Sequence, residues 1–544
     1  MKALKPKRKS LYYLLVLGII YLNIAYPSFA EIEKNNQTDI PKGKPLPASV
    51  TAVMNDTKYE HARWGFLVED LDTGEIIYQL NPQKMFVPGS TTKLYTGAAA
   101  LNVIGADYRF KTPVYARGEI DSSGNLNGDL ILVASGDLTM GGRTTPEDKI
   151  AYTNIDHGDA NALGNATLTA TNPLAGFDML VEQVSAAGIK NISGEVIIDD
   201  RLFEKINPPA SAEDYTLTPI VINDNLIDII IKPTQPGKAA EVEFRPQTSI
   251  YMIESNVSTT NFENSNETAQ TAQIEITKGG PGVIKVSGQI PAVESQIVQT
   301  YKVDDPSFFA RALLIEALER QGVKVNASIE SKNPENLLPA EMDYSKLERV
   351  ALLTSPPFSE NLKLILKVSQ NMQADSLLPL MAVQEGKRSF WDGLEVEGTF
   401  LEKTGLDLNS ISISDGRGNA DADFMTPEAT VYLLKYMAAT NDSQVYLDAL
   451  PILGVDGSLA NSVSPNSPVK GKVQAKSGTT AKYDAVNDRI IVSAKALGGY
   501  MTTSEGKRVA FALYVNNVPA QDIEEVNEIG NDLGKICEAI YNQN

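Results

Sequence analysis

Three short polar motifs constrain the fold of this chain most, because the chemistry that they can perform requires them to meet in one site. The motifs are Ser90-Thr91-Thr92-Lys93, Ser369-Gln370-Asn371 and Lys476-Ser477-Gly478-Thr479. The first two motifs begin 279 positions apart (369 − 90), and Lys476 follows Asn371 by 105 positions (476 − 371). The chain must therefore fold so that three distant segments converge.

The first motif pairs a serine with a candidate base. A serine hydroxyl is a weak nucleophile and needs a base within hydrogen-bond reach. Residues three apart share one face of a helix, so Lys93 can approach the hydroxyl of Ser90 if the segment 90–104 is helical, as its small and apolar residues predict. The chain has two histidines, His61 and His157, and neither lies in a motif. The sequence therefore favours lysine as the base.

Each motif alone is weak, since a Ser-x-x-Lys sequence is usually a solvated helix face and a Lys-Ser-Gly sequence is usually a turn. Their order and setting are more informative. Ser-x-x-Lys, Ser-Asp-Asn and Lys-Thr-Gly together mark class A β-lactamases and penicillin-binding proteins. This chain has the first motif and conservative versions of the other two. The set predicts an acyl-transfer enzyme with a nucleophilic serine.

Composition indicates an ordinary globular protein with a large core. The chain has 544 residues, of which 42% are hydrophobic and 21% charged, enough material for several domains. The net charge is −20, so the protein should repel nucleic acid, and a nucleic-acid partner is excluded. Two histidines and one cysteine, Cys537, argue against a zinc site, and we expect no metal or organic cofactor.

Residues 1–30 have the pattern of a secretory signal peptide. Five basic residues precede an apolar run from Leu11 to Tyr26, which ends in Ser28-Phe29-Ala30. We expect cleavage near Ala30, export to the periplasm and a mature net charge of −25, because five positive charges are lost from −20. The alternative is an uncleaved anchor, which would give weak membrane association.

The local sequence pattern divides the rest of the chain into an α/β domain and an insert that interrupts it. A hairpin over 64–80 and a helix from Ser90 begin the first part, 31–111. Short strand-like runs between polar loops predict a β-rich insert over 112–299. Within it, 141–171 and 254–273 are so polar that we expect long surface loops. Helical patterning returns in the second part, 300–544, around the second motif at 361–385, and a strand at 508–515 and a helix from Asp522 close the chain.

The chain resembles the penicillin-binding protein 4 type of D-alanyl-D-alanine carboxypeptidase and endopeptidase, peptidase family S13. The likeness covers nearly the whole mature chain. Beyond the motifs it includes Asp70-Leu71-Asp72-Thr73-Gly74-Glu75, Gly136-Asp137-Leu138-Thr139, Asp415-Gly416 and the run 450–459, Leu-Pro-Ile-Leu-Gly-Val-Asp-Gly-Ser-Leu. The long interval between the first two motifs also agrees, since the family places inserted domains there.

The resemblance implies an α/β (α+β) fold, with a transpeptidase or β-lactamase-like domain whose antiparallel sheet is flanked by helices. It implies a two-step reaction on peptidoglycan peptides and covalent binding of β-lactam antibiotics. The residue roles that it implies are a nucleophile, a base, a proton relay and a site for the substrate carboxylate. These roles belong in turn to Ser90, to Lys93, to Ser369 with Asn371, and to Lys476 with Ser477, Gly478 and Thr479.

Several positions depart from the pattern of the family. Gln370 stands where the family usually has aspartate, and Ser477 where it usually has threonine. After Asp415-Gly416 the family usually continues Ser-Gly-Leu-Ser-Arg, whereas this chain has Arg417-Gly418-Asn419-Ala420-Asp421. The position of the last arginine is therefore acidic. The acidic residue by which the insert contacts the substrate in this family maps best to Asp214.

Two other classes of function remain open at this point. A β-lactamase is the nearest enzymatic alternative, but it needs a deacylating base, and no convincing Glu-x-x-Leu-Asn-like segment lies between the second and third motifs. A catalytically silent peptidoglycan-binding protein is the other alternative, and such a protein would not need all of the motif side chains. Endopeptidase activity beside carboxypeptidase activity is also left open, and the sequence assigns no oligomeric state.

Overall fold

The computed structural model describes residues 43–208, 215–261, 272–418 and 421–544. The predicted signal peptide at 1–30 and the predicted substrate contact Asp214 therefore lie outside the described residues. Among the residues that are described, the helices are all too short or too polar to cross a membrane.

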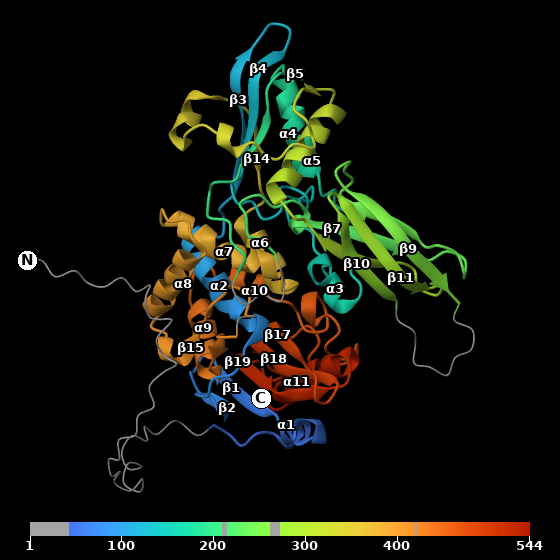
Figure 1. Cartoon of the computed structure of the whole chain (residues 1–544). Helices are drawn as coiled ribbons and strands as arrows, with labels where there is room; N and C mark the ends of the chain where they lie inside the picture. The colour runs from blue at the N-terminus through green and yellow to red at the C-terminus, as the bar shows by residue number, and fades with distance from the viewer. Residues whose placement is uncertain (1–42, 209–214, 262–271, 419–420) are drawn as a thin grey trace, which may run out of the picture. The chain divides into compact units, whose positions relative to one another are not determined.

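A central antiparallel sheet joins the two ends of the chain. Its order is β17-β18-β19-β1-β2, and a short strand, β20, pairs with one end of β18. The strands are β1 (Arg63–Asp70), β2 (Ile76–Leu80), β17 (Val473–Asp484), β18 (Arg489–Thr502), β19 (Arg508–Asn516) and β20 (Val518–Ala520). The pairing of β1 with β19 places the N-terminal strands beside the C-terminal ones (Figure 1). The predicted hairpin and final strand are present.

The two faces of this sheet carry different cores, because successive side chains of a strand point to opposite faces. In β19, Val509 and Phe511 belong to a cluster with the terminal helices α1 (Ala48–Met54) and α11 (Ile523–Asn542). The alternate residues Ala510, Ala512 and Tyr514 belong to a larger cluster on the other side. Cys537 is fully buried in α11, and burial raises the pKa of its thiol. Cys537 therefore contributes to the packing of this core.

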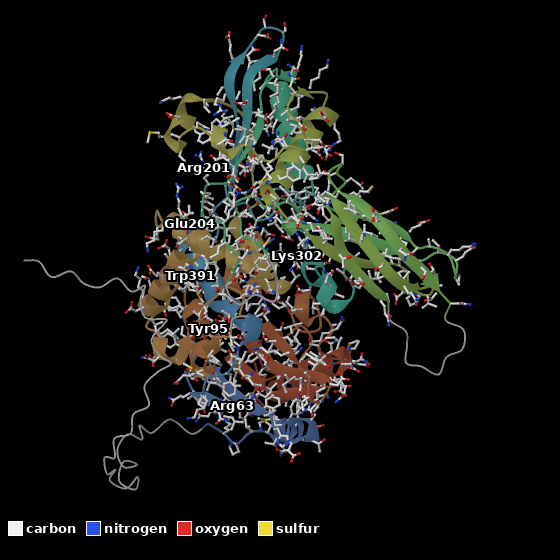
Figure 2. All side chains as sticks on the ribbon, viewed as in Figure 1. Arg63, Tyr95, Arg201, Glu204, Lys302 and Trp391 are labelled. Atoms are coloured by element: carbon white, nitrogen blue, oxygen red, sulfur yellow. The ribbon has the colours of Figure 1, made fainter. Side chains whose placement is uncertain are left out.

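The larger cluster is a layer of helices. It contains α2 (Lys93–Ile104), α6 (Phe358–Lys367), α7 (Asn371–Gln384), α8 (Phe390–Thr404), α9 (Pro427–Ala438) and α10 (Ser443–Ala449). Tyr95 of α2 lies inside this layer and is fully buried, whereas Trp391 lies at its surface (Figure 2). Short elements connect the layer: β15 (Ile411–Ser412), β16 (Phe424–Met425), η8 (Leu408–Ser410) and η9 (Gly457–Leu459). An antiparallel sheet flanked by helices confirms the predicted fold class.

The insert contains three further sheets. The largest has the order β13-β5-β4-β3-β14, with β6 beside β4, and consists of β3 (Lys111–Ile120), β4 (Asn125–Val133), β5 (Asn191–Ile192), β6 (Val196–Asp199), β13 (Lys324–Val325) and β14 (Glu348–Thr354). The second sheet comprises β7 (Leu226–Lys232), β8 (Glu241–Arg245) and β12 (Ile297–Lys302). The third comprises β9 (Met252–Thr260), β10 (Gln273–Gly280) and β11 (Val283–Pro291).

The hydrophobic core of the insert continues past residue 299. Helix α5 (Pro306–Arg320) packs with α4 (Ala175–Ala186) in this core, and β14 pairs along its length with β3. The sequence suggested a return to the first domain at 300, because helical patterning resumes there. We propose instead that the insert extends from about residue 111 to residue 354, since strand pairing and not local helix content decides to which core a segment belongs.

The polar stretch 141–171 is mostly irregular and lies largely at the surface, as predicted, but some of its residues are buried. It contains η4 (His157–Asp159) and α3 (Ala160–Leu163), and Ile150, Asp156 and His157 are buried. Polar residues can be buried where ion pairs and hydrogen bonds satisfy them, and hydrophobic periodicity does not reveal such pairs. The second polar stretch forms most of β9, and residues 262–271 lie outside the described part.

Candidate active site

The first motif forms a tight turn that continues into a buried helix. The 3-10 turn η3 (Gly89–Thr92) carries Ser90 and leads directly into α2, whose first residue is Lys93. Lys93 Nζ lies 2.9 Å from Ser90 Oγ. The side chain of Lys93 is fully buried, whereas Ser90 remains partly exposed. The predicted helix over 90–104 is present, with a tighter first turn than expected.

The second motif lies at a break between two helices. Ser369, between α6 and α7, has a left-handed backbone with φ 65°. The side chain of Gln370 caps α7 by accepting a hydrogen bond from the backbone N–H of Gln373 at 2.8 Å. Asn371, the first residue of α7, accepts a hydrogen bond from Lys93 Nζ through Oδ1 at 2.6 Å. The first two motifs therefore meet at Lys93.

The third motif lies on β17, the edge strand of the central sheet. Lys476 is fully buried, and its Nζ donates to Ser369 Oγ at 2.9 Å and to the carbonyl of Ser477 at 2.7 Å. Burial and the nearby charge of Lys93 hold the pKa of Lys476 well below its usual range, while Asp159 acts in the opposite direction. The structure thus joins all three motifs in one hydrogen-bonded group.

Glycine allows the third motif to approach the nucleophile turn closely. A Cβ atom on Gly478 would lie 2.3 Å from the carbonyl oxygen of Pro88 and 3.1 Å from the backbone nitrogen of Ser90. A Cβ atom on Gly89 would lie 2.8 Å from the backbone nitrogen of Thr479. The main chains of β17 and η3 are therefore in direct contact, and only residues without a side chain fit at these two positions.

The segment from the insert that precedes α3 packs beside the motifs. The side-chain oxygen of Asn154 accepts a hydrogen bond from the backbone N–H of Gly457 at 2.9 Å. The next residue, Ser458, shares a 2.7 Å hydrogen bond with the hydroxyl of Ser477. The sequence did not predict this role for Ser458, although Ser458 belongs to the run at 450–459 that carries the family resemblance. In the sequence, the segment 150–159 was distinguished only by its polarity, which did not indicate a place beside the motifs.

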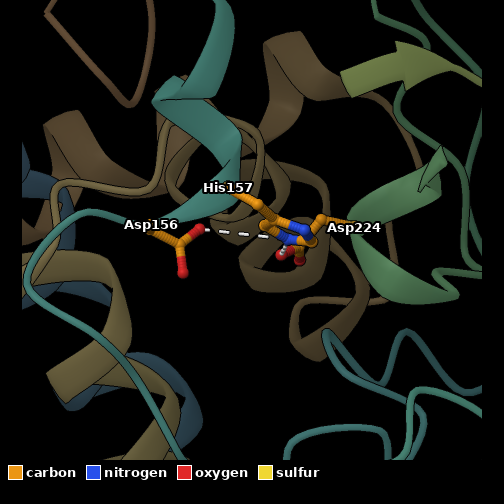
Figure 3. Close-up of side chains that lie close together, drawn as sticks. All are labelled: Asp156, His157 and Asp224. Carbon is orange, nitrogen blue, oxygen red and sulfur yellow. Dashed lines mark hydrogen bonds and ion pairs between the residues drawn. The ribbon is translucent and has the colours of Figure 1, made fainter. Parts of the chain in front are cut away.

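A buried charge cluster holds this segment in place. The imidazole of His157 lies between two carboxylates, with Nε2 2.8 Å from Asp224 and Nδ1 2.6 Å from Asp228 (Figure 3 shows the first). Arg143 donates to Asp224 at 2.7 Å and pairs with Asp156 at 2.7 Å. Burial lowers the pKa of His157, but the carboxylates outweigh it and raise this pKa to about 10. The cluster is thus a compensated network of ion pairs.

The same cluster touches the second motif. Asp224 Oδ1 accepts a hydrogen bond from Gln373 Nε2 at 2.7 Å, and Gln373 is the residue whose backbone Gln370 caps. Oxygens and nitrogens of Asp156, His157 and Asp224 lie within 4.8 Å of one another, as metal ligands would (Figure 3). Cationic Arg143 and protonated His157 already occupy these carboxylates, so we assign the cluster to structure and not to metal binding.

The segment after Asp415-Gly416 adopts an arrangement that the sequence did not predict. Arg417 is fully buried, and its backbone carbonyl accepts a hydrogen bond from Lys93 Nζ at 2.9 Å. Asp421 is exposed and pairs with Lys482 at 2.8 Å. Lys482 lies where β17 and β18 extend beyond the third motif as a long hairpin. Residues 481–489 belong to this hairpin.

Comparison with known proteins identifies the family. The sequence matches the D-Ala-D-Ala carboxypeptidase 3 (S13) family over residues 46–535. The chain belongs to this family. The predicted resemblance is therefore confirmed over nearly all of the described residues.

Relatives and solved structures agree in length and fold. The chain is 26% identical over 492 residues to a D-alanyl-D-alanine carboxypeptidase of Actinomadura sp., covering 87% of this chain and 81% of that protein. It is 23% identical over 533 residues to D-alanyl-D-alanine carboxypeptidase DacB of Haemophilus influenzae, covering 93% of each. The crystal structure of penicillin binding protein 4 from Haemophilus influenzae matches with a TM-score of 0.66 and 22% identity, over 89% of this chain and 98% of that one. The fold is thus shared along the whole family domain.

Proposed function

We propose that this family member is a serine-type D-alanyl-D-alanine carboxypeptidase that acts on peptidoglycan stem peptides through an ester on Ser90. The observation that carries the proposal is the contact of Lys93 Nζ with Ser90 Oγ at 2.9 Å, in a group that also includes Ser369, Asn371 and Lys476. Curated relatives with the name D-alanyl-D-alanine carboxypeptidase support the reaction.

In the first step, Ser90 Oγ bonds to the carbonyl carbon between the two D-alanines, and the bond from that carbon to the terminal nitrogen breaks. Lys93 takes the hydroxyl proton, and the proton passes by way of the Ser369 hydroxyl to the departing amine, while Asn371 holds Lys93 and the bound peptide in position. In the second step, water attacks the ester and the Ser90 hydroxyl is restored. The products are a shortened peptide and free D-alanine.

Substrate binding falls to the third motif. Lys476, with the hydroxyls of Ser477 and Thr479, holds the terminal carboxylate of the peptide. The backbone N–H groups of Ser90 and Thr479 stabilise the developing oxyanion, and each such donor is typically worth about 3 kcal/mol in the transition state. The close approach at Gly89 and Gly478 supports this assignment. Contact of Asp214 with the third residue of the stem peptide remains part of the proposal.

Penicillin fits the same site, because its lactam carbonyl takes the place of the peptide carbonyl. A structure of the Haemophilus influenzae protein is described as complexed with a β-lactam, which supports this binding. We also propose that the enzyme works in the periplasm after loss of residues 1–30, where its peptidoglycan substrate lies. No convincing deacylating glutamate was found between the second and third motifs, so the penicillin ester should persist.

Intact mass of the purified protein after incubation with penicillin tests the proposal. The parent should gain the mass of one penicillin, which peptide mapping should place on Ser90, and it should release D-alanine from a peptide ending in D-Ala-D-Ala. Ser90→Ala should lose both properties, and Ser123→Ala, which changes an exposed serine of the insert, should lose neither. A label on another residue would overturn the assignment. Rapid turnover of penicillin without a visible adduct would favour a β-lactamase.

A further inference from the structure

Lys93, the proposed base, contacts two motif residues and a third hydrogen-bond partner that lies outside the motifs. Lys93 Nζ reaches Ser90 Oγ at 2.9 Å, Asn371 Oδ1 at 2.6 Å and the carbonyl oxygen of Arg417 at 2.9 Å. As the base, Lys93 is a neutral amine with two N–H bonds and one lone pair, so donation to Asn371 and to the Arg417 carbonyl turns the lone pair toward the Ser90 hydroxyl. Two of these three partners are motif side chains. The third belongs to the main chain, so its position depends on what holds the backbone at residue 417.

That backbone is held by carboxylates. Asp415 Oδ1 accepts hydrogen bonds from the backbone N–H of Arg417 at 3.0 Å and of Gly418 at 2.6 Å. Asp375 Oδ1 accepts one from the backbone N–H of Gly416 at 2.8 Å. Asp375 lies on α7, one turn after Asn371. The helix that supplies one partner of Lys93 therefore also anchors the segment that supplies another.

The side chain of Arg417 ties these carboxylates together. Its Nε lies 3.2 Å from Asp415 Oδ2, its Nη1 lies 3.3 Å from Asp375 Oδ2, and Nη1 also donates to the hydroxyl of Tyr215. Arg417, Asp375 and Asp415 are all fully buried. A planar guanidinium can hold several acceptors in fixed directions, which an ammonium cannot do. Arg417 thus fixes both its own loop and the side of α7 that faces it.

Tyr215 connects this group to the insert. Its hydroxyl donates to Asp375 Oδ2 at 2.7 Å, and the guanidinium carbon of Arg417 lies 5.3 Å from the centre of its ring. Tyr215 pairs with Arg417 by both a hydrogen bond and a cation–π contact. Arg417 departs from the usual pattern of the family, which has serine at this position.

Two further buried acids, Glu397 and Asp423, interact electrostatically with the carboxylates that pair with Arg417. Burial raises the pKa of Asp375 to about 7 although Arg417 opposes the rise, and burial raises the pKa of Glu397 to about 8. Burial and Asp415 raise the pKa of Asp423 to about 9. Arginine stays charged at any working pH, so Arg417 provides a constant positive charge among carboxyl groups that can otherwise gain protons.

We propose that Arg417 is a positioning residue, which holds the carbonyl that orients the Lys93 amine toward Ser90 and which ties that carbonyl to Tyr215 of the insert. Arg417 does not touch the reacting atoms. It acts through Lys93, so its loss should slow the transfer of the Ser90 proton rather than weaken substrate binding. This inference rests on the proposed function of Lys93 as the base.

The test compares three variants in the full chain. Arg417→Lys keeps the charge and loses the planar fork, Tyr215→Phe keeps the ring and loses the hydroxyl, and Arg311→Lys is the matched control. Arg311 is also fully buried and paired, with Glu195 at 2.8 Å, but it lies in the insert. The measurements are the rate constant for penicillin acylation of Ser90 between pH 5 and pH 9, kcat and KM for a D-Ala-D-Ala peptide, and thermal unfolding.

We expect Arg417→Lys to lower the acylation rate constant by about 10²-fold, because a small displacement of a catalytic group has an effect of that size. KM should change little, and the pH at which acylation reaches half its maximum should shift, because the buried Asp375 then titrates beside a weaker partner. Tyr215→Phe should show the same changes to a smaller extent. Arg311→Lys should affect the unfolding temperature alone.

The possible outcomes separate this inference from the proposed function. If penicillin does not label Ser90 of the parent, the proposed function fails. If the parent is labelled and folded Arg417→Lys stays within about twofold of it at every pH, the inference about Arg417 is overturned. Should Arg417→Lys fail to fold, Tyr215→Phe decides, because a phenylalanine at that position keeps the packing. A parent-like rate and pH profile in Tyr215→Phe would then overturn the proposal.

Discussion

Lys476 Nζ donates a hydrogen bond to Ser369 Oγ at 2.9 Å, the same distance that separates Lys93 Nζ from Ser90 Oγ. The site therefore contains two lysine–serine pairs, one within the first motif and one between the third and second motifs. The charge of Lys93 lowers the pKa of Lys476, so the two pairs interact electrostatically. The second motif lies between the two pairs, since Asn371 accepts a hydrogen bond from Lys93 and Ser369 accepts one from Lys476.

Lys93→Arg should keep the positive charge and lose most of the acylation rate. A guanidinium cannot give up its proton at working pH, so the variant has no base beside Ser90. We expect acylation by penicillin to slow by about 10²–10⁴-fold, the usual contribution of a general base. The acylation rate is measured by stopping the reaction at set times and determining the intact mass of the protein. Lys346→Arg in the insert is the control. Acylation at nearly the parent rate would mean that Lys93 is only an electrostatic neighbour.

Lys476→Met should stabilise the empty protein and abolish recognition of the carboxylate. The pKa of Lys476 in the folded state lies well below 10.5, so the unfolded state binds a proton more readily, and the free energy of unfolding rises as pH increases through the folded pKa toward 10.5. At neutral pH the substitution should add about 1 kcal/mol to stability. Thermal unfolding at pH 7 and kcat/KM for a D-Ala-D-Ala peptide measure the two effects. A less stable variant would contradict the prediction.

Gly478→Ala should damage catalysis more than stability. An added Cβ atom would meet the carbonyl oxygen of Pro88 at 2.3 Å, which forces β17 away from the turn that carries Ser90. Separation of the two oxyanion donors should reduce kcat by about 10²–10³-fold. Gly398→Ala in α8 is the control, because a Cβ atom there meets nothing within 4 Å. Parent-like kcat in Gly478→Ala would show that Thr479 does not supply an oxyanion donor.

The sequence predicted the parts of the site that depend on local pattern. Ser90 and Lys93 are three residues apart on a helical segment, and the apolar runs that became β1 and β19 indicated strands. Arg417 could not be found in this way, because its contact with Lys93 comes from a main-chain carbonyl that any residue could offer. Its importance depends on Asp375, 42 positions earlier (417 − 375), and a single sequence does not show that these two residues pair.

The insert was predicted less well for a related reason. Residues 141–171 are polar, and polar residues usually lie at the surface. Here His157 and Asp156 are buried because Arg143, Asp224 and Asp228 compensate their charges. Such compensation depends on contacts between segments about 70 positions apart (224 − 157 and 228 − 157), whereas hydrophobic periodicity describes neighbours along the chain.

His157→Gln should reduce stability in a way that depends on pH. The pKa of His157 rises from 6.5 to about 10 on folding, so its stabilising contribution is complete below pH 6.5 and disappears as pH rises through 10. Linkage gives a contribution on the order of 4 kcal/mol at pH 6. The difference in free energy of unfolding between parent and variant should therefore narrow from pH 6.5 to pH 10. The exposed His61→Gln is the control. A difference that stays constant with pH would mean that His157 is not protonated in the folded protein.

Asp421→Arg should change the preference for the third residue of the stem peptide. The resemblance implies that the arginine usual at this position meets the distal carboxylate of a diamino acid, whereas Asp421 here is acidic, exposed and paired with Lys482. The parent should therefore cleave peptides with amidated diaminopimelate or lysine at least as well as peptides with a free distal carboxylate, because like charges repel. The variant should shift this preference toward the free carboxylate. Comparison of kcat/KM for the two kinds of peptide measures it, with Asp343→Arg as a control for net charge. Equal values in the parent that do not change in Asp421→Arg would show that this segment does not reach the substrate.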